Sequence, residues 1–342
     1  MRIEHGQRRP SLLRLVVRDL ALLCAALAVF FLFHQWLPFG SGEALQTIVS
    51  LHIPSATAAP TPTSSAEASA LAAASASPTA TATPAPTPTP APEPGDFSAA
   101  FPAGDTGLSA QYSYQSDDLK VAVQQVKEND VTYYVADVWV RTIEGFRTAF
   151  ANGKYGRGNP QMPLQVAEDN NAILAVTGDY YSARNNGIVI RNGELYRKSL
   201  LEDVCVLYSD GVMETTSKED FDLEDAVGRK AWQAWSFGPA LLKDGEAIET
   251  FTDSIRGHNP RCAIGYYEPG HYCMVAVDGR QSGYSVGMTL AELSQLMASL
   301  GCQSAYNLDG GATAAMVFQG QVINQPSGGG RRSSDIIFFG EE

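Results

Sequence analysis

The sequence predicts an α+β fold: a single domain with a central mixed or antiparallel sheet, β-hairpins and a few packed helices, placed after an N-terminal membrane anchor. Three observations support this. Apolar runs of strand length outnumber helical patterns in the C-terminal part of the chain. Asn-Gly and Asp-Gly pairs separate several of these runs, as is typical of hairpins. One apolar stretch near the N-terminus is long enough to cross a bilayer.

Residues 1–19 form the predicted cytoplasmic, basic N-terminus, and residues 20–40 the predicted transmembrane signal anchor. The arginines of the N-terminal region all precede the apolar run, and such a bias keeps the N-terminus in the cytoplasm. A cleaved signal peptide is the alternative, because the uninterrupted apolar core is short. The absence of a small-x-small site just after the core favours the anchor.

Residues 41–103 are rich in Ala, Ser, Thr and Pro. Such a segment buries too little apolar surface to offset its ordering entropy, so we expect a disordered stalk. The remaining residues, 104–342, form one domain, predicted to be extracytoplasmic in a single-pass protein of the cell membrane. After residue 100 the chain holds 19 basic and 31 acidic residues, a net charge of −12, which argues against a nucleic-acid partner.

Residues 119–127 and 131–141 are two predicted strands that meet at a turn, and 172–176 is a predicted buried strand. Two helices are expected. One covers about 221–227. The other begins with a capping box formed by Thr289 and Glu292 and ends at Gly301.

Four cysteines lie in the domain and none is in a C-x-x-C pair. If Cys262 and Cys273 flank a hairpin turn, Cys262 faces position 277, too far along the strand from Cys273 for a disulfide. Free buried thiols and other pairings both remain open.

Polar residues follow or open several of the predicted strands, where functional side chains commonly collect. The central example is Asn307-Leu308-Asp309-Gly310-Gly311, in which two glycines allow close backbone approach to a ligand. The others are segment 177–181, Gly238-Pro239, the segment from Arg261 to Gly265, Val277-Asp278-Gly279-Arg280, and three glycines before Arg331.

With these segments in order, the domain resembles the phosphodiester glycosidase family over about residues 172–339. The family's Asn-Leu-Asp-Gly-Gly matches 307–311, and its Arg-Thr-Ala-Ile-Gly matches 261–265, with Cys262 in place of Thr. Its Gly-Pro and Val-Asp-Gly-Arg segments match 238–239 and 277–280. The chain departs from the family at Thr177, where the family has Asn, and at Ala312, where many members carry Gly or Ser.

The resemblance implies a hydrolase that cleaves sugar-1-phosphodiester bonds, such as N-acetylglucosamine-1-phosphodiester bonds, in cell-envelope or exopolysaccharide glycans. A carboxylate suits the oxocarbenium-like centre as nucleophile or base, and arginine forks and glycine N–H groups suit phosphate oxygens. The predicted catalytic residues are Asp309, Asp278 and Asp179. The predicted substrate-binding residues are Arg261, Asn307, Gly310, Gly311, Thr313, Gly238, Tyr181 and Arg331.

Structural roles remain open for several of these residues: Asp278 before a glycine can cap a turn, Arg280 can be a solvated surface charge, and Tyr180 and Tyr181 can belong to the core. We predict no metal and no cofactor, because the carboxylates are dispersed over separate strands. The alternative function is a non-catalytic glycan-binding domain of the envelope, and Thr177 and Ala312 are the changes that favour it.

Overall fold

The computed structural model describes residues 95–104, 110–251 and 257–341. The predicted N-terminus (1–19), the predicted anchor (20–40) and most of the predicted stalk (41–103) lie outside these residues. Within the described part of the chain, no helix is both long and apolar enough to cross a membrane.

The largest sheet has six strands in the order β1-β2-β3-β14-β13-β15, and each neighbouring pair is antiparallel. The two strands predicted around residue 130 are confirmed as β2 and β3. They turn at Asn129 and Asp130, whose φ angles of 48° and 59° suit a two-residue hairpin. The strands are β1 (Tyr112–Gln115), β2 (Leu119–Glu128), β3 (Val131–Val140), β13 (Arg261–Glu268), β14 (His271–Val277) and β15 (Ser304–Leu308).

The hairpin of β13 and β14 contains a bulge between Tyr266 and Glu268. Because the bulge adds one residue to β13, Cys262 pairs with Ala276, one position from the predicted partner at 277. The conclusion that Cys262 does not bridge to Cys273 still agrees with the structure. All four domain cysteines are buried and free.

Helix α4 (Leu290–Ser299) begins as predicted: the Thr289 side chain accepts from the Glu292 N–H, and the Glu292 carboxylate accepts from the Thr289 N–H. Its apolar face belongs to a core cluster that also contains side chains of β13 and β14. The helix leads directly into β15, the strand that carries Asn307 at its C-terminal end.

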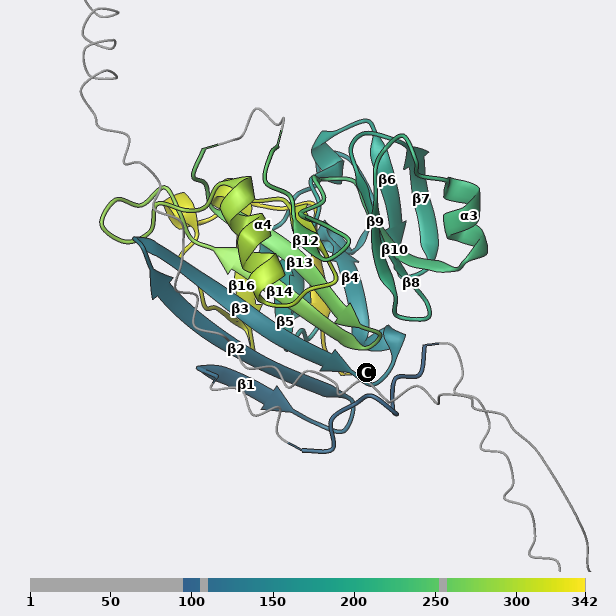
Figure 1. Cartoon of the computed structure of the whole chain (residues 1–342), viewed down its shortest axis with the longest axis horizontal. Coiled ribbons are helices and arrows are strands. Elements are labelled where there is room, and N and C mark those ends of the chain that lie inside the picture. Colours follow the sequence, from purple (N-terminus) through teal and green to yellow (C-terminus); the bar gives the residue numbers. More distant parts are fainter. Residues whose placement is uncertain (1–94, 105–109, 252–256, 342) are drawn as a thin grey trace, which may run out of the picture. The chain divides into compact units, whose positions relative to one another are not determined.

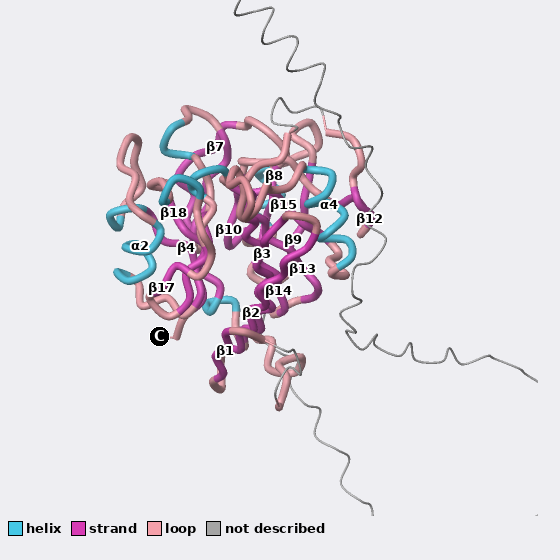
Figure 2. Tube along the Cα trace, turned by 90° about the vertical axis from the view of Figure 1, so that its left-hand side faces the viewer, coloured by secondary structure: helices cyan, strands magenta, loops and turns pink. Residues whose placement is uncertain are grey.

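A second antiparallel sheet has the order β17-β16-β5-β18-β4. The predicted buried strand is confirmed as β5, which is fully buried between β16 and β18. Figure 2 shows α2 (Pro163–Asp169) on the side of β4, β17 and β18. The strands are β4 (Phe146–Phe150), β5 (Leu174–Thr177), β16 (Met316–Phe318), β17 (Gln321–Val322) and β18 (Asp335–Phe339).

A third antiparallel sheet, in the order β7-β6-β10-β8-β9, is grouped with α3 (Leu223–Gly228) in Figure 1. Helix α3 confirms the helix predicted at about 221–227. The strands are β6 (Gly187–Arg191), β7 (Glu194–Ser199), β8 (Val204–Tyr208), β9 (Met213–Thr216) and β10 (Ala231–Trp235), and a separate hairpin pairs β11 (Leu242–Lys243) with β12 (Glu246–Ala247).

The predicted α+β class with antiparallel hairpins and few helices agrees with the structure. The prediction of one central sheet was too simple, because the described strands divide into three larger sheets and one short hairpin. Strand pairing across such distances along the chain is a tertiary property that local patterns do not encode.

Candidate active site

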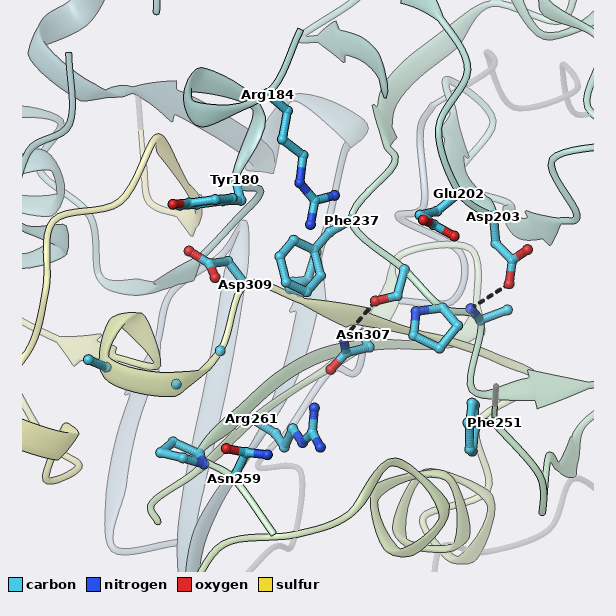
Figure 3. Close-up of a pocket in the computed structure, with 18 of the residues that line it drawn as sticks. Tyr180, Arg184, Glu202, Asp203, Phe237, Phe251, Asn259, Arg261, Asn307 and Asp309 are labelled. Atoms are coloured by element: carbon cyan, nitrogen blue, oxygen red, sulfur yellow. Dashed lines mark hydrogen bonds between the residues drawn. The ribbon is translucent and has the colours of Figure 1, made fainter. Parts of the chain in front are cut away.

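Ends of strands from all three larger sheets meet around one cavity of about 830 Å³ (Figure 3). The end of β15 supplies Asn307 to Gly311, and the start of β13 supplies Arg261. The segment after β10 contributes Phe237 to Ala240, and the turn after β5 contributes Tyr180. Residues that lie more than a hundred positions apart therefore share one concave surface, the usual form of a small-molecule site.

Asp309 lies at this cavity with only 4% of its surface exposed. Burial raises the pKa of its carboxyl group to about 7. The Thr313 side chain and the charges of Arg331 and Arg184 oppose that increase, while the charge of Asp179 adds to it. The Asp309 Oδ2 atom accepts no hydrogen bond from the described residues, and its ion-pair partner is Arg331 Nη2 at 3.8 Å. A buried acid that titrates near neutrality suits proton transfer.

Four arginines line the same cavity: Arg184, Arg261, Arg280 and Arg331. The Arg184 guanidinium lies 5.0 Å from the ring centre of Phe237 and 5.8 Å from that of Tyr180. The Arg331 guanidinium lies 5.5 Å from the ring centre of Tyr180. Tyr180 therefore packs against two cations at once, an arrangement that restrains both side chains.

The other two arginines are held by the loops around β13. Arg280 donates from Nε and Nη2 to the side-chain oxygen of Asn259. Arg261 is buried and donates from Nε to the Met288 carbonyl and from Nη2 to the Gly257 carbonyl. Both guanidinium groups are thus fixed in orientation, which favours recognition of an anion.

The two glycines of the central motif have different roles. A Cβ at Gly310 would lie 2.7 Å from the Pro260 carbonyl oxygen, so this position has no room for a side chain. Gly311 has φ of 63°, and a Cβ there would lie 3.3 Å from Arg280 Nη1. The pair lets the loop after Asp309 pass close to both β13 and Arg280.

Three of the glycine N–H groups expected to suit phosphate oxygens donate to carbonyls of the protein instead. The Gly311 N–H donates to the Pro260 carbonyl, the Gly329 N–H to Pro326 and the Gly330 N–H to Ser327. These donors are already used inside the protein, so the arginines remain the main cationic contribution to the cavity.

Asn307 and Gly238 both line the cavity and are hydrogen bonded to each other. Asn307 Nδ2 donates to the Gly238 carbonyl at 2.7 Å, and the Asn307 N–H donates to the Pro239 carbonyl at 3.1 Å. These two bonds join β15 to the loop after β10 and fix the Asn307 amide in one orientation.

Two further predicted binding residues support the site from outside its lining. Thr313 is fully buried and its hydroxyl donates to the Gly310 carbonyl. Tyr181 is also buried, and its ring stacks on Tyr155 with 5.2 Å between ring centres. The cavity lining includes neither of them.

The structure places Asp278 in a hydrogen-bond cluster away from the lining. Its carboxylate accepts from the Tyr284 hydroxyl and Asn324 Nδ2, each at 2.8 Å, and from the Gln325 N–H at 3.0 Å. Burial raises the pKa of Asp278, and these donors act against that rise. A carboxylate satisfied by this many donors is explained by packing alone.

Asp179 also lies below the cavity surface rather than in its lining. Its carboxylate accepts from the Tyr180 N–H at 2.6 Å and lies 3.5 Å from Arg191 Nη2. The Asp179 N–H donates to Asp335 Oδ1 at 2.6 Å. Of the three predicted catalytic acids, Asp309 alone lines the cavity.

The cavity also has an acidic part that the sequence did not predict. Glu202 and Asp203 line it, and Figure 3 shows both on the far side of Phe237 from Asp309. Asp203 Oδ2 accepts from the Ala240 N–H at 3.1 Å. Arg184, Asn259 and Phe237 also line the cavity and are not among the predicted residues. Arg280, for which a role as a surface charge was the alternative, lines it too. The Val-Asp-Gly-Arg segment marks Arg280, and Phe237 and Asn259 stand beside the Gly238-Pro239 and Arg261 segments. No local motif marks Arg184, Glu202 or Asp203.

Among the described residues, no cluster of three or more His, Cys, Asp or Glu side chains is arranged to hold a metal ion. The prediction that no metal is required stays a prediction.

A buried acid beside four arginines at the ends of strands defines a site suited to a negatively charged substrate. Residues 170–339 match the family model described as phosphodiester glycosidase, and this part of the chain belongs to that family.

A Bacillus subtilis (strain 168) protein, the SPbeta prophage-derived uncharacterized protein YomE, is 27% identical over 247 residues. The alignment covers 64% of this chain, and the chain spans 38% of that protein's length. Among solved structures, the chain is similar to the catalytic domain of zebrafish N-acetylglucosamine-1-phosphodiester alpha-N-acetylglucosaminidase, auto-inhibited by its pro-peptide. The TM-score is 0.54 at 20% identity, covering 68% of this chain and 86% of that domain. At this identity the likeness shows a common fold.

Proposed function

We propose that the domain hydrolyses the bond between the anomeric carbon of a sugar and the phosphate of a phosphodiester, as in N-acetylglucosamine-1-phosphodiesters of cell-envelope or exopolysaccharide glycans. One observation carries this proposal: a buried carboxyl group with a pKa of about 7, that of Asp309, shares a cavity with four arginines. Membership of the phosphodiester glycosidase family supports the same class of reaction.

The arginines hold the phosphodiester anion and stabilise the charge that develops on the leaving phosphomonoester. A phosphomonoester leaves as a stable anion, so the site needs charge stabilisation more than a strong acid at this position. Arg184 and Arg331 both pack against Tyr180, Arg331 forms an ion pair with Asp309, and Arg280 lies beside Gly311.

Asp309 acts at the anomeric carbon. In its ionised form it takes the proton of the attacking water or attacks the carbon itself, and either role stabilises an oxocarbenium-like transition state. The aromatic faces of Tyr180 and Phe237 supply apolar surface for the sugar ring. Glu202 and Asp203 supply acceptors for hydroxyl groups at the other end of the cavity.

The test is turnover of sugar-1-(p-nitrophenyl phosphate) diesters by the full-length chain. Hydrolysis at the anomeric carbon yields free reducing sugar and p-nitrophenyl phosphate without p-nitrophenol. In water enriched in oxygen-18, the label enters the sugar and not the phosphate. Release of p-nitrophenol, or label in the phosphate, would mean attack at phosphorus and would contradict the proposed reaction.

The second candidate function is binding of an envelope glycan without catalysis. Ala312 favours it, because this residue lines the cavity where many family members place a glycine or a serine. Thr177 does not weigh in its favour: it is fully buried, its hydroxyl donates to the Thr313 carbonyl, and it lies outside the lining. Saturable binding of the diesters above without any sugar release would favour this function.

On this proposal the domain acts outside the cytoplasm, held by the N-terminal anchor through the stalk. The arginine bias before the apolar run and the Ala/Ser/Thr/Pro-rich segment support this placement. Protease added to intact cells should remove the domain and leave a small anchored fragment. Complete protection of the domain from protease would contradict this topology.

A further inference from the structure

A chain of backbone hydrogen bonds connects Asp309 to β18. The Asp309 N–H donates to the Gly178 carbonyl at 3.0 Å, and the Gly178 N–H donates to the Asp335 carbonyl at 3.2 Å. The position of Asp309 therefore depends on how the turn after β5 is held against β18.

The Asp335 carboxylate fastens that turn. Its Oδ1 atom accepts from the Asp179 N–H at 2.6 Å. A Cβ at Gly178 would collide with the same oxygen, so the glycine leaves the space into which the carboxylate fits. Asp335 is fully buried, and burial raises the pKa of its carboxyl group.

Arg191 enters this cluster from β6 of the third sheet. It is 2% exposed, and its Nε donates to Asp335 Oδ2 at 2.8 Å while Nη2 lies 3.5 Å from Asp179 Oδ2. Its Nη1 donates to the carbonyls of Ile190 and Ala234. The guanidinium is thus fixed by its own sheet and presents its remaining donors to two buried carboxylates.

We propose that Arg191 is a positioning residue for Asp309: it holds the carboxylates of Asp179 and Asp335 in place and offsets their negative charge beneath the cavity. With two carboxylates and one guanidinium, the cluster holds one acid more than it has cations. Removal of Arg191 leaves two acids without a buried cation, which is costly in an apolar interior.

Four groups on different elements act on the protonation of Asp309: Arg331, Arg184, Thr313 and Asp179. The arginines and the threonine favour its ionised form, and Asp179 disfavours it. Of Asp179, Arg191 and Asp335, Asp179 is the member whose charge acts on Asp309. This inference rests on the proposed function only in giving Asp309 a catalytic role.

The experiment titrates Asp309 by ¹³C NMR in full-length chains labelled at aspartate, with the resonance assigned by its loss in Asp309→Asn. Four proteins are compared: the parent, Asp179→Asn, Arg191→Met and the double variant. In Asp179→Asn the midpoint should fall by about 0.5–1 pH unit, because a like charge is removed. In Arg191→Met it should rise by a similar amount, and in the double variant it should return toward the parent.

Arg229→Met is the matched control, because Arg229 pairs with Glu214 at the exposed surface of the same sheet. Its Asp309 midpoint should equal that of the parent. If Arg191→Met does not fold, the proposal is tested with Asp179→Asn, because asparagine keeps the shape of the aspartate side chain. A midpoint in Asp179→Asn equal to that of the parent would overturn the proposal.

The titration needs no substrate, so its result is separate from whether the diesters are hydrolysed. Where they are, Arg191→Met should lower kcat at least tenfold with a smaller change in KM, and Arg191→Lys should restore part of the loss. An unchanged kcat in a folded Arg191→Met protein would also overturn the proposal.

Discussion

Replacement of Asp309 by asparagine is expected to abolish most of the turnover while making the protein more stable. Asparagine keeps the shape of the side chain but has no proton to exchange near neutral pH and no negative charge to oppose the oxocarbenium-like centre. Loss of a general base costs roughly 10²–10⁴ in kcat, and loss of a nucleophile more.

The gain in stability follows from the raised pKa of the carboxyl group. In the folded protein the pKa of Asp309 is about 7, compared with a usual value of 3.8. Between these two values the folded state binds more protons than the unfolded state, so the free energy of unfolding decreases as the pH rises through this window. A shift of about three pKa units corresponds to roughly 4 kcal/mol at pH 7, an upper limit because the new amide is itself incompletely hydrogen bonded.

The assay is urea unfolding of the parent and of Asp309→Asn at pH 5 and pH 8, together with kcat on the same preparations. The stability difference should favour the variant and should be larger at pH 8. In the parent, turnover should rise with pH through about 7 as Asp309 ionises. Equal stabilities at both pH values, or turnover within threefold of the parent while Asp278→Asn or Asp179→Asn is inactive, would refute the reasoning.

Three further predictions concern neighbouring residues. Arg261→Lys should raise KM for the phosphodiester about tenfold or more, because a lysine ammonium cannot keep both carbonyl contacts that orient the guanidinium. Steady-state kinetics check this, and an unchanged KM would contradict it. Asp278→Asn should lower the free energy of unfolding by about 1–3 kcal/mol, because one amide oxygen cannot accept from all the donors of Tyr284, Asn324 and Gln325. The folded variant should keep the kcat of the parent. Loss of turnover without loss of stability would argue for a catalytic role. Thr177→Val should lower the free energy of unfolding by a similar amount, about 1–3 kcal/mol, because the buried Thr313 carbonyl and Ala315 N–H both lose their bond to the Thr177 hydroxyl. Urea unfolding measures this, and an unchanged free energy of unfolding would contradict it.

Local patterns were sufficient to predict the hairpin of β2 and β3, the buried strand β5 and the capped helix α4. Each of these is determined by residues close together in the chain: two turn residues, a short apolar run, or a capping box. The same holds for Asp309, Asn307, Gly238, Arg261 and Arg331, which stand in marked motifs and all line the cavity.

The rest of the cavity depends on long-range packing. Glu202 and Asp203 precede β8 of the third sheet, and only the folded chain brings them to the same cavity as β15. Arg184 follows a short 3₁₀ turn (Tyr181–Ala183) and reaches the site through contacts with Phe237 and Tyr180. No local sequence signal distinguishes such residues from solvated surface charges.

The three acids of the prediction differ in how completely the protein satisfies them, and this difference separates structural from chemical roles. Asp278 accepts from three donors, and Asp179 is bound by the Tyr180 N–H and by Arg191. Asp309 has an oxygen without a hydrogen bond from the described residues, and its arginine partner is half exposed and 3.8 Å away. A buried carboxylate is stable in its ionised form when hydrogen-bond donors surround it. A buried carboxylate with too few donors keeps its proton until a ligand or a change of pH alters its surroundings. The missing hydrogen bonds of Asp309 destabilise the folded protein. The Asp309→Asn substitution, which should remove turnover, should therefore increase stability.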